Sequence, residues 1–241
     1  MPEHEIAKHT KEIYKAWSMP GVSIKHKVIE ILIEIAIIVF AITLSLFVER
    51  WREQIHDRKI ESQFLKGLKK DLSEDLIQLK EDSLSYVDVL HGWSYLRNAG
   101  INNLPLDKDS VAKYQYSLGT FTDFIPNDSR FEALKSSGEL TVLEDDSLEN
   151  LILDLYQNRI KSMLSATGFF TKFHTDQMMP FVLENAKVAK PGYTNLDYLI
   201  RIPRMQNYFI MANGVADILN RYHKVMEQSR QIIHMIDQGR K

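Results

Sequence analysis

The chain has 241 residues, of which 44% are hydrophobic, 10% aromatic and 26% charged, and its formal net charge is −2. This composition gives no general attraction to nucleic acid, and its apolar content is too high for a disordered chain. The lack of cysteine excludes disulfides and thiol chemistry, while few glycines and prolines between long Leu-rich stretches predict an all-α protein.

An amphipathic helix is expected at the start of the chain. In "EHEIAKHTKEIYKAW", Ile6, Ile13 and Trp17 fall on one helical face and three lysines fall on the other. A short basic helix of this kind can lie on an anionic lipid surface. The Met-Pro-Gly sequence at 19–21 then interrupts it. We therefore assign residues 1–24 to an amphipathic segment, with Trp17 as a membrane anchor.

Residues 28–48 form the most apolar stretch of the chain. As a helix it would be about 31 Å long, close to the hydrocarbon thickness of about 30 Å. Lys25 and Lys27 precede it, and Trp51 and Arg52 follow it. Basic and aromatic residues at both ends are typical of membrane interfaces. The pattern predicts a transmembrane helix within residues 25–52; the alternative is a buried helix of a soluble protein.

Polar and small residues form a stripe on this segment. At 100° per residue, Glu30, Glu34, Ala41 and Ser45 share one face. Small residues allow helices to approach closely, and polar groups can hydrogen-bond across the contact. We interpret the stripe as a contact within a homo-oligomer or with another membrane protein. Two alternatives remain: a ring of Glu34 carboxyl groups that carries protons or cations, and a protonated or snorkelling Glu34 with no special task.

The orientation of the segment is only weakly encoded. Five lysines precede it and five basic residues follow it closely, but only the following set is interleaved with acidic residues. Positive residues favour the cytoplasmic side. We therefore expect a cytoplasmic N-terminus and a C-terminal domain, residues 53–241, outside the cytoplasm.

This domain is expected to be a helical bundle. No glycine or proline occurs between Val22 and Lys66, so the transmembrane helix should continue into a long helix that "NAGINNLP" ends. Its predicted apolar stripe comprises Leu65, Leu68, Leu72, Leu76, Leu79, Val87, Leu90 and Trp93.

Shorter helices should follow. Asp107 or Asp109 can cap a helix at 110–118, and Ser129 with Glu132 forms a capping box for a helix that Gly138 stops. One of the residues at 145–147 should cap a longer helix that continues toward Pro180. Residues 187–203 should form a loop, with or without a short helix.

A long C-terminal helix should close the bundle. Nine residues from Tyr208 to Ile236 alternate spacings of four and three, which is a heptad pattern. This pattern is compatible with antiparallel packing inside the chain and with a coiled coil between chains.

Three features together resemble a known group of proteins. They are the spacing from Glu34 across an apolar stretch to Trp51 and Glu53, the charged helix "FLKGLKKDLSEDL", and the segment "RFEALKSSGELTVLEDDSLENLILDLY". They are similar to those of uncharacterised Gram-negative single-span membrane proteins that share a domain of unknown function. The resemblance covers residues 28–160. It implies a bacterial inner-membrane protein with a helical periplasmic domain, and it implies no activity.

The sequence offers little catalytic chemistry. It contains no phosphate-binding loop, dinucleotide fingerprint, nucleophile elbow or zinc-protease motif. His174 and Asp176 are a weak acid–base or metal pair, and a structural histidine is the simpler interpretation. We therefore expect no enzyme, no metal and no cofactor.

The function expected from the sequence is a membrane-anchored helical scaffold, sensor or accessory subunit that assembles through its transmembrane helix. Its expected partners are the lipid bilayer and either further copies of itself or another membrane protein, without nucleic acid. The alternative is an oligomeric ion-conducting or force-transducing assembly that uses Glu34.

Overall fold

A computed structural model describes residues 24–189 and 192–239, and these are almost wholly helical, which confirms the all-α prediction. The chain divides into two units, Met1–Ile60 and Glu61–Lys241. Helix α2 (Ile24–Ile101) belongs to both, which confirms that the apolar segment continues into a long helix. The amphipathic helix expected ahead of residue 24 lies outside the described residues.

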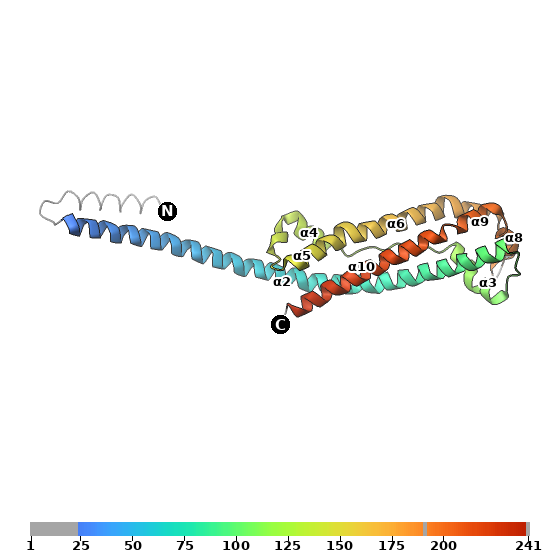
Figure 1. Ribbon diagram of the computed structural model, residues 1–241, viewed down its shortest axis with the longest axis horizontal. Helices are drawn as coiled ribbons and strands as arrows, with labels where there is room; N and C mark the ends of the chain where they lie inside the picture. The colour runs from blue at the N-terminus through green and yellow to red at the C-terminus, as the bar shows by residue number, and fades with distance from the viewer. Residues whose placement is uncertain (1–23, 190–191, 240–241) are drawn as a thin grey trace. The chain divides into compact units, whose positions relative to one another are not determined.

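The second unit is built on three long helical tracts (Figure 1). The first is the later part of α2, and the last is α10 (Ala212–Gln238). Between them, residues 146–185 form one uninterrupted helical tract with two π-helical turns. Its parts are α5 (Asp146–Asp154), η3 (Leu155–Arg159), α6 (Ile160–Phe173), η4 (His174–Met178) and α7 (Met179–Asn185).

Short elements join these tracts. Those before α5 are α3 (Lys108–Tyr114), η1 (Gln115–Leu118), α4 (Ser129–Ser137) and η2 (Glu139–Val142). Those after α7 are β1 (Val188–Ala189), β2 (Gly192–Tyr193), α8 (Leu196–Leu199) and α9 (Pro203–Phe209). The two strands pair antiparallel, with Val188 opposite Tyr193. The loop predicted at 187–203 therefore contains a minimal hairpin and a single helical turn.

Side-chain capping explains where two of the short helices begin, α3 and α5. The Asp107 carboxylate caps α3 by accepting hydrogen bonds from two backbone N–H groups, and Asp145 caps α5 in the same way. The capping box predicted at Ser129 was wrong. Asp128 is the residue before α4, it has helical backbone angles and its side chain makes no capping bond. The chain thus enters the helix one residue early, whereas Gly138 ends it as predicted, at φ 77°.

A cluster of aromatic side chains forms the centre of the second unit. Trp93 of α2 lies 5.4 Å from Phe170 of α6 and 6.1 Å from Phe209 of α9, measured between ring centroids. Tyr86 of α2 lies 5.7 Å from Tyr222 of α10. All five rings are fully buried. Buried aromatic rings stabilise a fold through the apolar area they bury and through favourable edge contacts, so this cluster stabilises the packing of the three long tracts against one another.

Helix α10 packs antiparallel to α2 inside the same chain. Tyr222 meets Tyr86, while Asp237 near the end of α10 forms an ion pair of 2.5 Å with Lys69 near the start of the unit. Most of the predicted heptad positions, including Val215 and Ile236, are buried in this bundle. Tyr208 lies in α9, because a turn separates α9 from α10.

An extended segment, residues 120–127, takes the place of a fourth helix; we call it the strap (Figure 1). It makes no backbone–backbone hydrogen bonds within the described chain. Side chains of α2 bind it instead: Tyr86 donates to the carbonyl of Thr122 at 2.9 Å, and Asp75 accepts the backbone N–H of Asn127 at 3.2 Å. Since buried backbone groups require partners, these side chains fix the strap's path.

Gly100 near the end of α2 lies where this helix packs closely against the segment that contains Ile200 and Gln206. A Cβ there would collide with the backbone carbonyl of Ile200 and with the side chain of Gln206, whereas a Cβ at Gly168 of α6 would meet nothing within 4 Å. We expect Gly100→Ala to lower the free energy of unfolding by about 1–3 kcal/mol through overpacking. Gly168→Ala should raise it by about 0.5–1 kcal/mol, because alanine favours helix. Chemical denaturation of the full chain, followed by circular dichroism, measures both, and equal effects would contradict the close approach.

Candidate functional site

The apolar side chains of residues 28–48 in α2 are largely exposed. Within α2 there is a stretch long and apolar enough, by length and composition, to cross a membrane, and none of it is buried. Ile37, Phe40 and Phe47 are each more than half exposed. In the middle of the segment, the Thr43 hydroxyl donates to the carbonyl of Val39 at 2.7 Å, so this polar group is satisfied within the helix.

The residues of the predicted stripe lie on one regular helix. Glu30, Ala41 and Ser45 are exposed, and Glu34 is half-buried. Their spacing on α2 places all four on one face. The structure contains one copy of the chain, so the role of this face as a contact stays a prediction.

The predicted membrane anchors are described only in part. Lys25, Trp51 and Arg52 have exposed side chains on α2, with Trp51 60% exposed. The side chain of Lys27 and all of Trp17 lie outside the described residues. Exposed side chains on α2 are compatible with any surface role, so the role of these residues as membrane anchors stays a prediction.

His174 and Asp176 do not form a functional pair. The His174 Nε2 lies 2.7 Å from the carbonyl of Leu118, and the ring is fully buried against Trp93 and Phe121. Because a carbonyl only accepts, Nε2 carries the proton; burial lowers the pKa of His174 and keeps the ring neutral. Asp176 is exposed and pairs with Lys172 at 2.8 Å. This arrangement favours a structural histidine.

Two buried carboxylates on α2 hold the strap. Asp75 accepts from the backbone N–H and, at 2.7 Å, from the side-chain amide of Asn127. Asp82 accepts from the Thr122 hydroxyl, while its second oxygen is buried without a partner among the described residues. Desolvation is the main cause that raises the pKa of Asp75, to about 6, and it also raises the pKa of Asp82. Both groups face protein and not a cavity, so we interpret them as structural.

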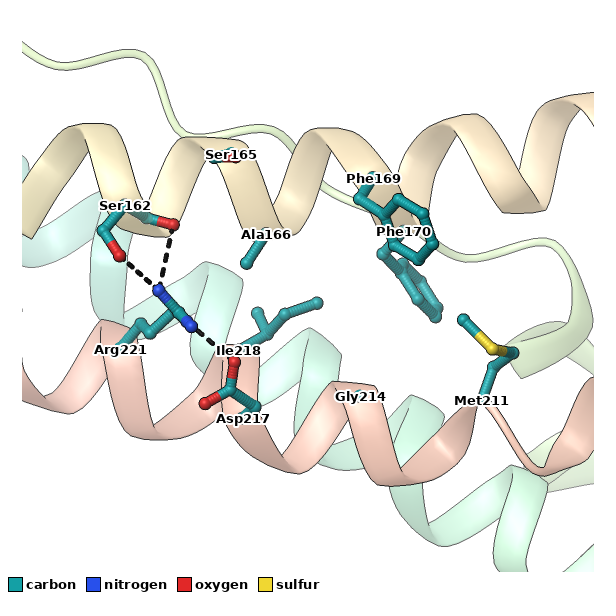
Figure 2. A pocket seen from close by; sticks show the side chains of 10 residues that line it. All are labelled: Ser162, Ser165, Ala166, Phe169, Phe170, Met211, Gly214, Asp217, Ile218 and Arg221. Carbon is teal, nitrogen blue, oxygen red and sulfur yellow. Dashed lines mark hydrogen bonds and ion pairs between the residues drawn. The ribbon is translucent and has the colours of Figure 1, made fainter.

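A groove lies between α6 and α10 in the second unit (Figure 2). Its volume is about 430 Å³, and small residues such as Ala166 and Gly214 line its floor and walls. Phe169 stands at one end, 66% exposed, near Met211. At the other end Arg221 forms an ion pair of 2.8 Å with Asp217.

The groove continues past Arg221 into a second hollow of about 280 Å³. Ser162, Asp217 and Arg221 line both hollows, so the two hollows are neighbours along α6 and α10. Arg221 also donates to the hydroxyl and the carbonyl oxygen of Ser162 (Figure 2). Arg159, at the end of the π-helical turn η3, and Lys224 of α10 line the second hollow. We call the two hollows together the α6–α10 groove.

Sequence reasoning did not find this groove. Its walls come from residues 59 positions apart in the case of Ser162 and Arg221, and neither belongs to a recognisable motif. The one local signal is the spacing of Gly214, Asp217 and Arg221, which places a glycine and an ion pair on successive turns of one helix.

Part of the chain matches a known protein family. Residues 34–176, more than half of the chain, match the family described as "Family of unknown function (DUF6090)". No curated protein and no solved structure matches the chain. The matched range includes most of the apolar segment, the strap and α6, but not α10.

The titration of Asp75 should be measurable as a change in stability. Its pKa is raised from 3.8 to about 6 in the folded chain, so the folded state holds this proton more tightly than the unfolded state. The protonated Asp75 carboxyl therefore adds to the free energy of unfolding at pH 4. This contribution is lost as the pH rises through 6, where the folded chain also releases the proton. Asp75→Asn keeps an acceptor for Asn127 but cannot ionise. We expect the variant to gain stability relative to the wild type between pH 4 and pH 7, by at most about 3 kcal/mol.

Denaturation of both proteins at several pH values measures this difference directly. Taking the difference between the two proteins removes the contributions of other carboxylates. Asp71 and Asp128 lie nearby and raise the pKa of Asp75 further. A difference that stays constant over this pH range would show that the buried group does not titrate as described.

Proposed function

This chain belongs to the family of unknown function DUF6090, and we propose that it is a membrane-anchored helical protein that acts as a scaffold, sensor or accessory subunit. In this proposal α2 crosses a bacterial inner membrane, and the second unit is the extracytoplasmic, periplasmic part. The role is one of binding and assembly, without catalysis.

The exposed apolar segment is the observation that carries the proposal. Its side chains, among them Leu32, Phe40 and Phe47, are at least half exposed along several turns of α2. Apolar surface in water is unfavourable by about 25 cal/mol per Å², and soluble monomers rarely expose large continuous patches. A lipid bilayer covers such a helix on all sides, and the helix satisfies its own backbone groups there.

The proposal also includes the orientation of α2 in the membrane and the Gram-negative origin of the protein. Basic residues ahead of the segment have few acidic neighbours, which supports a cytoplasmic N-terminus. The intramembrane glutamate and the bounding Trp51 support an origin among Gram-negative single-span proteins.

Assembly through the stripe of Glu30, Glu34, Ala41 and Ser45 is the second part of the proposal. A carboxylate that faces lipid in mid-membrane is unfavourable by a few kcal/mol, and a contact with another helix relieves part of this. Alanine and serine on the same face allow that close approach.

Membrane anchoring can be tested with a pair of matched substitutions. Val39 in the middle of the apolar segment and Ile55 beyond it are equally exposed, at 56% and 54%. An aspartate at the centre of a transmembrane helix opposes insertion by about 2.5–3.5 kcal/mol. We expect the wild type and Ile55→Asp to resist carbonate extraction and to require detergent, and Val39→Asp to lose membrane association. Complete release of the wild type by carbonate would refute the anchor.

The stripe can be tested with two alanines of the same helix. Ala41 lies in the stripe, whereas Ala36 lies on the opposite face. We expect Ala41→Leu to weaken self-association about tenfold, since interhelical contacts in membranes contribute about 1–2 kcal/mol. Ala36→Leu should leave it unchanged. Analytical ultracentrifugation in mild detergent measures both, and equal behaviour of the two variants would exclude this face as the contact.

Glu34→Gln separates assembly from ion conduction. The amide of glutamine has nearly the same size as the carboxyl group and can still form hydrogen bonds, but it cannot ionise and so cannot carry a proton across the membrane. We expect unchanged association and no change in proton or cation flux across proteoliposomes. A flux in the wild type that disappears in the variant would favour the conducting assembly.

A further inference from the structure

We propose that the α6–α10 groove binds a long-chain fatty acid, with its hydrocarbon tail at the Phe169 end and its carboxylate at the Lys224 end. The inference concerns the second unit alone and does not depend on how α2 is anchored.

The groove is polarised along its length. Phe169, Phe170 and Met211 lie at one end, which is lined by apolar side chains (Figure 2). Arg221 and Lys224 line the other, together with Arg159. The change from apolar to cationic side chains along the α6–α10 groove matches a molecule with an apolar tail and an anionic head.

The cationic end has capacity for an anion. Lys224 is exposed and has no acidic partner among the described residues. Arg221 uses Nε for Asp217 and one Nη for Ser162, which leaves the other Nη of its guanidinium for a ligand oxygen. Asp217 is the single acidic residue that lines the groove, and Arg221 already neutralises it. Arg159 pairs with Asp154 at 2.7 Å, so Lys224 is the one cation of this end without an acidic partner among the described residues, and it supplies the excess positive charge.

The apolar end has room for a chain. Gly214 borders the hollow, and a Cβ placed on it would meet no atom within 4 Å. Ser165 and Ala166 of α6 also line the hollow and are small, so they leave it open. The exposed ring of Phe169 would be covered by a tail lying against it, and covering apolar area is the main source of affinity here.

The arrangement fits an amphiphile better than a fourth helix. An amphipathic helix separates apolar and polar residues between its two faces along its whole length. A groove for such a helix would be apolar from end to end with charged rims. Here the change from apolar to cationic occurs along the axis of the groove, so a head-and-tail molecule matches it.

The experiment uses the full chain in nanodiscs with a photoreactive palmitate analogue, followed by peptide mapping of the cross-links. We expect labelling of peptides that contain Phe169 or Met211. Gly214→Leu fills the hollow and should lower this labelling about tenfold, the effect of about 1.4 kcal/mol in binding. Gly168→Leu is the matched control, since Gly168 is also helical and also has open space at its Cβ but does not line the groove.

The head position is tested by reversing one charge. Lys224→Glu should lower labelling about tenfold. Lys161→Glu makes the same change on the exposed surface of α6, outside the lining residues, and should have no effect. Circular dichroism of the four variants is the control that shows whether each of them keeps the helical fold. Labelling that is equal in the wild type and every variant would show partition into the bilayer alone and would overturn the proposal.

Two further outcomes would also overturn it. If unlabelled lysophospholipid displaces the probe at lower concentration than palmitate does, the head group is a phosphate and not a carboxylate. The chain has no cysteine, so a single Ser165→Cys variant reports on protein neighbours. Disulfide-linked dimers of this variant would show that a second copy covers the groove.

Discussion

The fold of the second unit depends on how the backbone of the strap is satisfied. An extended segment inside a helical bundle has no neighbouring strand, so its N–H and C=O groups must find other partners or remain unpaired at a penalty of about 1–3 kcal/mol each. Helix α2 supplies partners for strap backbone groups from one face, through Asp75, Gln78 and Tyr86, and on the same face Asp82 accepts from the side-chain hydroxyl of Thr122. Trp93 continues the series by donating to the carbonyl of Ser117 at 2.9 Å. Helix α2 thus contributes side chains to the apolar core and also the polar side chains that hold the strap in the place of a fourth helix.

This arrangement makes the faces of the bundle unequal. The strap lies between α2 and α6, because Asp123 also accepts from Thr171 of α6 at 3.3 Å. On the other side of α6, no segment of the described chain fills the space beside α10, and small residues keep it open. The same bundle therefore has one side closed by its own chain and one side accessible to a ligand. Phe170 contacts the aromatic core and also lines the groove, so the two regions share a wall.

Much of this structure follows from local sequence. The absence of helix breakers between Val22 and Lys66 was enough to predict the continuous α2, and Asp107 and Gly138 marked helix ends because capping chemistry acts within a few residues. The strap could not be predicted, since Asp75 and Asn127 are 52 residues apart and a buried aspartate looks in the sequence like one more solvated charge. The groove was hidden for the same reason. Its walls meet only after the tract of residues 146–185 has packed on α10.

Three buried polar groups with shifted pKa values, Asp75, Asp82 and His174, lie against other parts of the second unit. A catalytic acid or base must reach a cavity in which a substrate can lie, and its pKa is commonly shifted there. In this chain the shifted groups Asp75, Asp82 and His174 face the strap or the aromatic core, and none of them lines the groove. Conversely, Asp217 and Arg221 in the groove form an exposed ion pair, which suits the recognition of a charged group. The chain therefore buries Asp75, Asp82 and His174 in contacts of its own fold, whereas Asp217 and Arg221 lie where a ligand can meet them.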